Sequence, residues 1–554
     1  MLKSAIVTAA LLASAPAAYA QSTSAGGQLQ QIPPAPERPE TPPDFTIEPA
    51  VPAPEVGPAG PAIRVDTLRV TGATLFDPQV LLAASGFAPG SELTLPEMRA
   101  IAARISAYYH TRGYFLAQAY VPEQDVQSGA VTIAVMEGRY GAVRLENGST
   151  LADRVALGVL SGLDSGDIVA AAPLERRLLL LSDLPGVRVA STLSPGATVG
   201  SSDLAVELRD GPRVTGSVEA DNAGNRYTGE YRAGGTLNLN NPLGIGDQLS
   251  LRILASTGGL AYGRAAYQLP VGNMTLGVSY ARVRYQLGRE FETLDADGTA
   301  DVASLYASYP LIRSRDLNLY ALGALDAKWF EDSVGLVSAQ SSKRSRAATL
   351  GFRADARDSL GGGGWSDLAA GVTVGELEIR SPLERAADAL TARTDGGFGK
   401  FQFAASRLQT LGGPLSLFAS VRGQLAFDNL DTSEKMELGG AYGVRAYPEG
   451  EAYGDEGVIF TGEARLALSQ WTPFLPGRLQ AIAFIDLGRV DYAHSPWFAG
   501  ANTSYRRGVG AGLTWAGPDG FFASASYAHR LGDQPVTSGP DRSGRFLFQI
   551  VKIF

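Results

Sequence analysis

The chain has 554 residues, no cysteine, and 47 basic against 56 acidic side chains, which gives a net charge of −9 at pH 7. Without cysteine, a disulfide scaffold and a thiolate metal site are excluded. The acidic balance gives no overall attraction for nucleic acid, so nucleic acid is not an expected partner. A mean hydropathy near zero and 66 glycines suit strands that alternate lipid-facing and water-facing side chains, although a large soluble β-solenoid has similar values.

The N-terminus has the features of a secretory signal peptide. Lys3 supplies a positive charge, Ala5 to Ala15 form a short apolar stretch, and Ala18-Tyr19-Ala20 is a small-x-small cleavage site. A single membrane anchor is the alternative, but the stretch is too short to span about 30 Å of hydrocarbon, and Pro16 interrupts it. We expect residues 1–20 to be a signal peptide that is removed on export.

Residues 21–61 are rich in Pro and Ala, with the pairs Pro33-Pro34 and Pro42-Pro43. This composition favours an extended, polyproline-like linker and prevents a packed core. Only Gly27 to Ile32 suits a short helix, and such a helix is not stable alone. Beyond the signal peptide no window has the ~20 consecutive apolar residues of a spanning helix, so a membrane location requires a closed barrel.

Residues 62–138 have the pattern of a small α+β domain. The predicted elements are a strand over Ile63–Val70, helices over Asp77–Ala84 and Thr94–Tyr109, and strands over Tyr114–Val121 and Val131–Met136. Thr94 and Glu97 form a capping-box pattern at the start of the longer helix. The apolar residues of that helix recur at helical spacing and are expected to pack against a sheet. They are Met98, Ile101, Ala102, Ile105 and Tyr109.

The same order of elements recurs over residues 139–211. The predicted elements are a strand over Ala142–Leu145, helices over Leu151–Leu160 and Leu174–Leu184, and strands over Val187–Leu193 and Leu204–Arg209. The last strand and its Asp-Gly stop match Val131 to Gly138 in pattern. Two copies of one module of about 75 residues, at the small end of domain sizes, are therefore predicted.

Residues 212–554 lack helical periodicity and alternate apolar and polar residues between Gly, Asp, Asn and Pro turns. From Leu317 to Trp329, for example, every second residue is lipid-compatible. Such segments number about sixteen, which predicts a membrane β-barrel of antiparallel strands. The last predicted strand is Arg545 to Phe554. Its terminal aromatic is expected at the membrane interface, and Lys552 is expected to extend towards the headgroups.

A catalytic site is not expected. The three histidines, His110, His494 and His529, are widely separated and lack metal-ligand spacing, and no nucleophile-elbow pattern accompanies them. No phosphate-binding loop precedes a helix, so nothing indicates use of ATP. The sequence therefore predicts a protein that is not an enzyme and has no cofactor or metal.

The most unusual stretch lies between two predicted strands, at residues 439–457. It is long and glycine-dense for a hairpin and contains Val444-Arg445-Ala446-Tyr447. This segment resembles the lumen-inserted sixth extracellular loop of the transporters of two-partner secretion, the TpsB proteins, whose hallmark is Val-Arg-Gly followed by Tyr or Phe. In this chain Ala446 stands where the glycine usually is, so a positive φ at that position would be lost.

Further stretches resemble the same family, in the same order along the chain. Two look like its POTRA modules, two like its opening barrel strands, and one like its inner-wall strand motif. They are Ala119 to Asp125, Asp183 to Val187, Asp221 to Gly224, Asn240 to Asp247, and Phe484 to Gly488. The resemblance covers nearly the whole mature chain, so residues 62–138 and 139–211 are identified as POTRA domains and residues 212–554 as the barrel.

The resemblance also implies roles for single residues. Val444, Arg445 and Tyr447 would lie at the tip of the inserted loop, and Arg445 would pair inside the barrel with Asp486. The alternative is that both are ordinary solvated charges of the lumen. Phe554 would act as the signal for barrel assembly. The family also has an N-terminal plug helix, which in this chain is expected to be short or missing.

By this resemblance the chain is an outer-membrane pore whose POTRA domains recognise an unfolded exoprotein in the periplasm. Its expected partners are a large secreted protein of the TpsA type, outer-membrane lipid, and the barrel-assembly machinery for its own insertion. Two rival hypotheses remain: an insertase of the barrel-assembly type, whose members have more POTRA copies, and a passive porin, which would not need the Arg445 loop. The class of the client stays open among adhesin, haemolysin and contact-dependent toxin.

Overall fold

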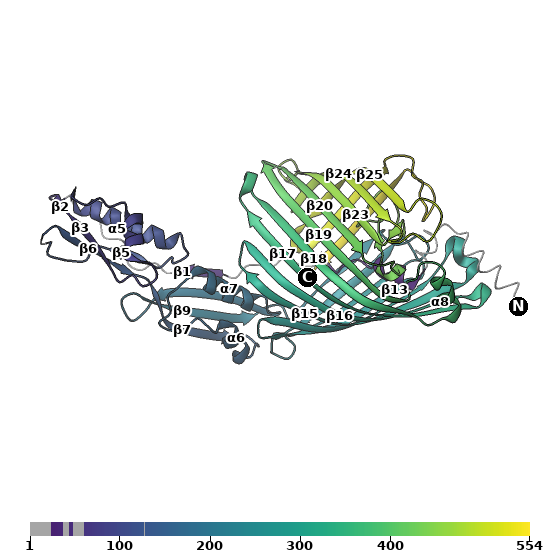
Figure 1. Ribbon diagram of the computed structural model, residues 1–554, viewed down its shortest axis with the longest axis horizontal. Helices are drawn as coiled ribbons and strands as arrows, with labels where there is room; N and C mark the ends of the chain where they lie inside the picture. Colours follow the sequence, from purple (N-terminus) through teal and green to yellow (C-terminus); the bar gives the residue numbers. More distant parts are fainter. Residues whose placement is uncertain (1–23, 37–43, 48–59, 127) are drawn as a thin grey trace. The chain divides into compact units, whose positions relative to one another are not determined.

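The computed structural model describes residues 24–36, 44–47, 60–126 and 128–554 (Figure 1). The expected signal peptide, residues 1–20, lies outside the described residues. The chain forms two compact units, one of Thr41–Pro212 with Leu243–Gly246 and the other of the remaining residues. The first unit holds two α+β modules, and the second unit holds the barrel.

The first module places two helices beside small sheets. Its elements are β2 (Ile63–Val65), β3 (Thr67–Thr71), α4 (Pro78–Ser85), β4 (Ser91–Leu93), α5 (Leu95–His110), β5 (Gln118–Tyr120) and β6 (Ala130–Met136). One sheet has the order β3-β6-β5, with β3 parallel and β5 antiparallel to β6, and β2 pairs separately with β4. The predicted strand Ile63–Val70 is therefore two strands, divided at Asp66.

The packing face of α5 matches its sequence pattern. Thr94 caps the helix, its backbone N–H donating to the Glu97 carboxylate at 2.7 Å. The five apolar residues predicted to face the sheet are all buried. The predicted strand Tyr114–Val121 is shorter than expected, because Tyr114 and Ala117 form turns after the helix, with the Tyr114 N–H donating to the Tyr109 carbonyl at 3.1 Å.

A buried carboxylate ties the first module together. Glu137 accepts hydrogen bonds from the backbone N–H groups of Thr74 and Leu75, from the Thr74 hydroxyl, and from the Tyr109 hydroxyl at 3.0 Å. Burial by itself would raise the pKa of Glu137, but these hydrogen bonds outweigh it, so the pKa lies below its ordinary value. The carboxylate thereby joins the β3–α4 connection to the end of β6.

The second module repeats this order with longer strands. Its elements are β7 (Arg139–Gly148), α6 (Asp153–Leu160), α7 (Ala171–Ser182), β8 (Val187–Pro195) and β9 (Ser201–Asp210). The sheet order is β1-β8-β9-β7, where β1 (Asp44–Ile47) pairs in parallel with Ala190–Leu193. Residues 21–61 were predicted to be an extended, polyproline-like linker in which only Gly27 to Ile32 suits a short helix, and no strand was predicted. Four of them form this strand, which covers the β8 edge of the sheet.

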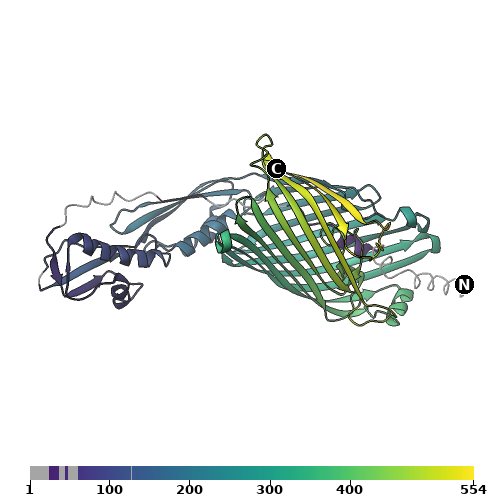
Figure 2. The same cartoon turned by 90° about the horizontal axis from the view of Figure 1, so that it is seen from above.

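The barrel is a closed sheet of sixteen strands, each antiparallel to its neighbours (Figure 2). The number predicted from the sequence is confirmed. The strands are β10 (Val214–Asp221), β11 (Arg232–Asn240), β12 (Gln248–Ser256), β13 (Ala261–Val271), β14 (Met274–Gln286), β15 (Ala296–Arg313), β16 (Leu317–Val334), β17 (Ala339–Asp358), β18 (Gly364–Ile379), β19 (Gly396–Gly412), β20 (Leu415–Ala426), β23 (Glu456–Ala467), β24 (Arg478–Asp491), β25 (Thr503–Ala516), β26 (Phe521–Arg530) and β27 (Gly544–Ile553).

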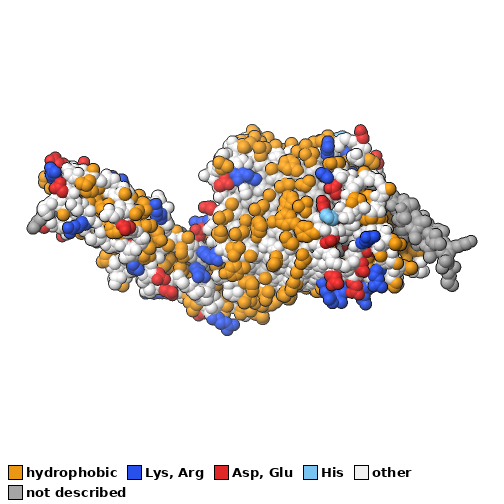
Figure 3. All heavy atoms as spheres, in the orientation of Figure 1, with side chains coloured by type: hydrophobic (Ala, Val, Ile, Leu, Met, Phe, Trp, Pro, Cys, Tyr) orange, Lys and Arg blue, Asp and Glu red, His pale blue; other side chains and the backbone are white. Residues whose placement is uncertain are grey.

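The two faces of the wall differ as the alternation predicts. On β16 the residues at odd positions from Leu317 to Trp329 face outward, whereas Lys328 faces the lumen, where its Nζ lies 2.5 Å from Glu434 Oε1. Apolar side chains form a broad band on the outer wall (Figure 3). Among the described residues, no helix is both long enough and apolar enough to cross a membrane.

The barrel closes where its first strand pairs with its last strand, and these two strands share few register pairs. β10 and β27 share five register pairs, from Ser217↔Ile553 to Asp221↔Gln549, whereas β10 and β11 share eight. Gly216 and Phe554 extend this seam, because the backbone N–H of each donates to the carbonyl of the other at 2.9 Å. The Phe554 side chain is 47% exposed at this position.

Candidate functional site

A long connection between β20 and β23 folds back against the inner wall of the barrel. It runs over residues 427–455, and within it β21 (Met436–Glu437) pairs antiparallel with β22 (Tyr453–Gly454). The sequence pattern set the bounds of this inserted loop at 439–457, but β23 already begins at Glu456. The inserted loop is therefore a small folded unit and not a simple hairpin turn.

Arg445 of the inserted loop and Asp486 of β24 form a two-pronged ion pair. Arg445 Nε donates to Asp486 Oδ2 and Nη2 donates to Oδ1, both at 2.8 Å, and the Arg445 backbone N–H also donates to Oδ2. The Asp486 side chain is fully buried and the Arg445 side chain is 14% exposed. These are therefore not independently solvated charges. Their geometry fixes both the distance and the orientation of the loop.

The pair has further partners that the sequence did not predict. Arg445 Nη1 donates to Glu463 Oε1 on β23 at 2.8 Å, and the guanidinium lies 3.5 Å from the centre of the Phe484 ring. The Thr461 hydroxyl donates to Asp486 at 2.9 Å. Thr461 and Glu463 occupy alternate, lumen-facing positions of one strand. That alternation identifies them as inward-facing, but nothing in it indicates which loop residue they contact.

The other predicted tip residues are buried. Val444, Ala446 and Tyr447 have no exposed surface, and the Tyr447 hydroxyl donates to the Gln534 carbonyl at 3.2 Å. Ala446 does not adopt a positive φ. Its methyl group lies against Gly508 of β25, where an added Cβ would be 2.6 Å from the Ala446 Cβ. The space for alanine in place of the usual glycine is therefore provided by Gly508.

A second ionic contact holds the inserted loop. It was not predicted from the sequence, where Glu451 is only a charged residue in a glycine-dense stretch. Glu451 is fully buried and accepts from Arg506 Nε of β25 at 2.9 Å and from Nη2 at 2.5 Å. It also accepts from the backbone N–H groups and the hydroxyls of Thr537 and Ser538, each at 2.9 Å. Both carboxylate oxygens are thus fully used.

The last strand of the barrel contacts the inserted loop as well. Arg545 of β27 donates from Nη1 to the Tyr447 carbonyl at 2.7 Å and from Nη2 to Glu449 Oε2 at 3.2 Å. The inserted loop is therefore joined to β24, to β25, to β27, and to the connection between β26 and β27.

The short helix α3 (Ala25–Gln30) lies in the barrel lumen. Its first N–H, that of Ala25, donates to Asp332 of β16 at 2.8 Å, and the Gln30 side chain donates to the Thr432 carbonyl of the inserted loop at 2.9 Å. Gly26 packs against Ser433, where an added Cβ would be 2.8 Å from the Ser433 Cβ. The short helix expected at Gly27 to Ile32 is therefore present, but it begins and ends two residues earlier.

Two arginines hold the chain that follows α3. Arg232 of β11 donates to the Gln31 carbonyl at 3.0 Å, and Arg252 of β12 donates to the Pro33 carbonyl at 2.7 Å. Beside this segment, the inserted loop and the inner faces of β15 to β20 leave a cavity of about 860 Å³. Within the described part of the chain, no three His, Cys, Asp or Glu side chains are arranged to bind a metal ion.

Comparison with known proteins gives the family. The family described as haemolysin secretion/activation protein ShlB/FhaC/HecB matches residues 200–514, which is more than half of the chain, and the ShlB-type POTRA domain matches residues 63–138. The chain belongs to the ShlB/FhaC/HecB family. The expected relation to the TpsB transporters of two-partner secretion is therefore confirmed.

Several members of the ShlB/FhaC/HecB family align over most of their length. The heme/hemopexin transporter protein HuxB of Haemophilus influenzae strain 86-028NP is 26% identical over 479 residues, which cover 84% of this chain and 82% of HuxB. The outer membrane transporter CdiB of Dickeya dadantii strain 3937 is 25% identical over 399 residues, which cover 70% of this chain and 69% of CdiB.

Solved structures agree on the fold. CdiB from Escherichia coli superposes with a TM-score of 0.71 at 24% identity, over 91% of this chain and 93% of that chain. BamA from Haemophilus ducreyi lacking POTRA domains 1–3 gives a TM-score of 0.51 at 14% identity, over 89% of this chain and all of that chain. At these identities the likeness concerns the fold alone.

Members of the ShlB/FhaC/HecB family are outer-membrane transporters that secrete exoproteins, with their POTRA domains in the periplasm. This chain is accordingly an outer-membrane transporter that secretes an exoprotein. Because β10 follows the second module directly in the chain, the end of the barrel at which β10 begins is the periplasmic end. The connections after β10, β14 and β20 lie at the extracellular end.

Proposed function

We propose that the two modules of residues 62–138 and 139–211 capture an unfolded exoprotein in the periplasm, and that the barrel of residues 212–554 passes it to the cell surface. In this proposal Arg445, Asp486 and Glu463 hold the inserted loop in its resting position. The buried ion pair of Arg445 and Asp486 carries the proposal, because a passive porin does not need a lumen-inserted loop that is fixed to the wall by a buried charge pair.

The lumen supports a gated passage. α3 and the inserted loop both occupy it, and they contact each other through Gln30 and Thr432. The cavity of about 860 Å³ beside them is walled by lumen-facing strand residues. An extended polypeptide needs a continuous channel, so either element has to move before a client can pass.

Replacing Arg445 by Ala tests the role of the inserted loop. We expect the variant to insert and fold as a barrel, seen as heat-modifiable migration in gels, while secretion of the partner falls below detection. Arg489→Ala is the matched control, because Arg489 lies on the same strand as Asp486 but its side chain is 49% exposed and contacts Asp491 and the Tyr505 ring, not the inserted loop. Normal secretion by Arg445→Ala would refute the role of the pair.

Client capture is proposed to use main-chain pairing at a free sheet edge, or the groove between helix and sheet. In the first module β3 and β5 are the edge strands, whereas β1 covers the β8 edge of the second. A photo-reactive residue at Tyr120 of β5, which is 45% exposed, or at Arg69 of β3 should cross-link to the client in secreting cells. Leu157 on α6 is 54% exposed and serves as the control position.

The proposed partner is one large exoprotein, and comparison of culture supernatants tests it. In cells that lack this gene, one large protein should vanish from the medium and be degraded or accumulate in the periplasm, with porin levels unchanged. An unchanged medium with many depleted barrels would favour the insertase hypothesis. If neither the proteins of the medium nor the levels of outer-membrane barrels change while the neighbouring genes are expressed, the porin hypothesis is favoured.

Phe554 is proposed to guide insertion of the barrel by the barrel-assembly machinery. Its side chain is half-exposed and lies over Gly216, where an added Cβ would be 3.0 Å from Phe554 Cζ, and the backbones of the two residues are hydrogen-bonded to each other. Phe554→Ala should therefore lower the amount of inserted barrel while the molecules that do insert retain secretion. A normal amount of Phe554→Ala in the outer membrane would contradict this role.

A further inference from the structure

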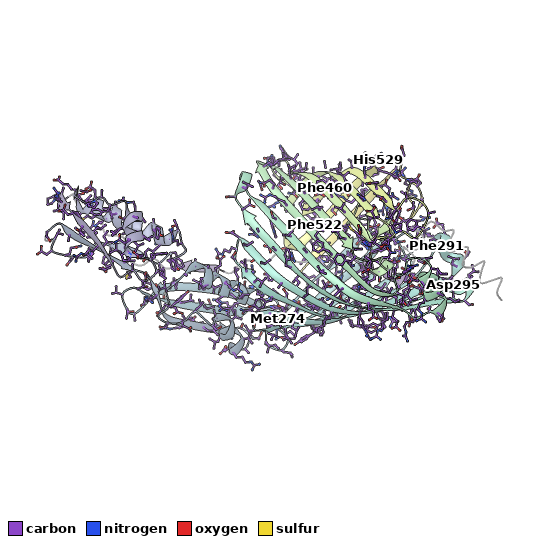
Figure 4. All side chains as sticks on the ribbon, viewed as in Figure 1. Met274, Phe291, Asp295, Phe460, Phe522 and His529 are labelled. Carbon is purple, nitrogen blue, oxygen red and sulfur yellow. The ribbon has the colours of Figure 1, made fainter. Side chains whose placement is uncertain are left out.

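Charged residues begin abruptly on the outer wall of the barrel at its extracellular end. On β14 the outward positions run from Val278 to Tyr280, Arg282 and Arg284, and they alternate with Val283 and Tyr285, which are buried. Figure 4 places Met274, at the start of this strand, at one end of the barrel, and Phe291 and Asp295, which follow the strand, at the other.

A second pair of outward arginines lies on β17. Arg344 and Arg346 alternate with the buried Ser345. The lumen-facing position before them is Lys343, which binds Asp431 of the inserted loop at 2.8 Å. Figure 3 shows blue and red side chains gathered beside the apolar band at the lower right of the barrel.

Strand register relates the two arginine pairs. One cross-strand row contains Arg282, Asp301, Trp329, Arg344 and Glu378, in the order of β14 to β18. The adjacent row on the periplasmic side contains Tyr280, Ala303, Ala327, Arg346 and Glu376. Aromatic residues that favour the membrane interface therefore lie in the same rows as the arginines.

The thickness of the apolar band places these rows at headgroup level. The outward residues of β16 are apolar from Leu317 to Trp329 and become acidic at Glu331. About twelve residue steps give about 40 Å of strand, which at a tilt near 40° spans about 30 Å of membrane thickness. The arginines thus lie where hydrocarbon gives way to lipid headgroups of the outer leaflet.

The arginines lack adequate partners within the protein. Arg284 and Arg346 are exposed, and neither forms an ion pair with any residue that the structure describes. Arg282 approaches Asp301 only at 3.7 Å, and Arg344 contacts the Trp329 ring at 5.7 Å without a carboxylate partner among the described residues. The register partner of Arg346 is Glu376, which lies beyond ion-pair distance.

The periplasmic end of the same wall is different. Arg407 of β19 faces outward there, and Asp358 neutralises it with two hydrogen bonds, at 2.8 Å and 3.0 Å. An outward arginine at the periplasmic end is therefore satisfied by the protein itself, whereas Arg284 and Arg346 at the extracellular end are available to an external anion.

We propose that Arg282, Arg284, Arg344 and Arg346 form a binding site for a glycolipid of the outer leaflet that carries two phosphate groups. A guanidinium binds a phosphate by two parallel hydrogen bonds. Arg282 and Arg344 lie in one cross-strand row, three strand spacings apart. At about 4.8 Å for each spacing they are about 14 Å apart, so a single phosphate cannot contact both. A disaccharide headgroup phosphorylated at both ends has the required separation of charges.

The wall beside Arg282 leaves room for such a headgroup. Its neighbour on β13 is Gly263, and the neighbour of Arg284 is Ala261. A Cβ added to Gly263 would meet no atom within 4 Å, so this part of the wall is open. The carboxylates of Asp301, Glu331 and Glu376 lie on the strands next to the two arginine pairs and repel a phosphate. A phosphate group can therefore bind only beside one of the arginine pairs.

The test is native mass spectrometry of the full-length protein in detergent with EDTA, which removes divalent cations that would bridge carboxylate and phosphate. The probes are bisphosphorylated lipid A, monophosphorylated lipid A, dephosphorylated lipid A, phosphatidylglycerol and inorganic phosphate. The variants are Arg284→Gln with Arg346→Gln, and Arg407→Gln as the matched control. Heat-modifiable migration of each variant verifies that the barrel is folded.

Wild type and Arg407→Gln should retain bisphosphorylated lipid A, and the double variant should bind it about twenty-fivefold more weakly, about fivefold for each arginine. Monophosphorylated lipid A should bind with intermediate affinity, and the dephosphorylated form should bind as weakly to wild type as to the double variant. Equal retention by wild type and double variant would overturn the proposal. Equal retention of phosphatidylglycerol would overturn the assignment to a glycolipid, and binding of inorganic phosphate alone would overturn the assignment to a lipid.

Discussion

Glu451 and Arg506 form a buried ion pair, with 2.5 Å between Glu451 Oε1 and Arg506 Nη2, and it joins the inserted loop to β25. The same carboxylate binds the N–H groups of Thr537 and Ser538 in the connection between β26 and β27. The inserted loop therefore also holds an extracellular segment in place. If the inserted loop moves during secretion, this connection is released with it.

Glu451→Gln should loosen the connection between β26 and β27. The amide cannot neutralise the buried Arg506, and breaking a buried pair costs about 3–5 kcal/mol. We expect trypsin to cleave after the exposed Arg542 several times faster on intact cells. Glu290→Gln is the control, because its pair with Arg226 lies at the surface, where loss of a partner has little effect. Equal cleavage of wild type and Glu451→Gln would contradict this account.

Arg445→Lys should behave like Arg445→Ala in secretion although it keeps the charge. One ammonium cannot engage both oxygens of Asp486 and the Glu463 carboxylate together, and it does not stack on the ring of Phe484 as a planar guanidinium does. The measurement is the amount of partner in the medium at equal levels of folded barrel. Arg489→Lys, on the same strand, should secrete normally. Secretion by Arg445→Lys at the wild-type level would show that charge alone suffices.

Gly508→Ala should displace the tip of the inserted loop, because its methyl group would overlap that of Ala446. Overpacking of this kind costs about 1–3 kcal/mol. Combining it with Ala446→Gly removes the overlap and should restore the thermal stability of the barrel in detergent. Ala446→Gly alone should be tolerated. If the double variant is no more stable than Gly508→Ala, the contact between residues 446 and 508 does not limit the site.

Elements that rest on local signals were predictable from the sequence. The apolar face of α5 follows from helical spacing, and its start follows from the Thr94 and Glu97 capping pattern. The strand number of the barrel follows from period-two alternation between turns. Predictions failed where contacts outside the local pattern decide the structure. The Tyr114 N–H donates to the Tyr109 carbonyl, so β5 is shorter than predicted. Four residues of the proline-rich linker form β1 because they pair with β8.

The contacts of the inserted loop were predictable only in part. Arg445 and Asp486 are 41 residues apart in sequence, and the resemblance to a known family suggested their pairing, since spacing cannot. Glu463, Glu451 and Arg506 were missed. Alternation identifies strand residues that face the lumen, but the choice of partner depends on the path of the loop, which no short-range pattern encodes.

Glu137→Gln should destabilise the first module by about 1–3 kcal/mol, because the donors of Thr74, Leu75 and Tyr109 lose a carboxylate acceptor. Hydrogen exchange of α5 and β6 in the full-length protein measures this, with the exposed Glu123→Gln as the control. The pKa of Glu137 is lowered from 4.5 in the folded state, so its contribution is complete above about pH 4.5 and is lost as the pH falls through the lowered pKa. The difference in exchange between wild type and Glu137→Gln should therefore be constant from neutral pH to about pH 5 and shrink below pH 4.5. A difference that instead grows on acidification would show that the carboxylate is not held in its charged form.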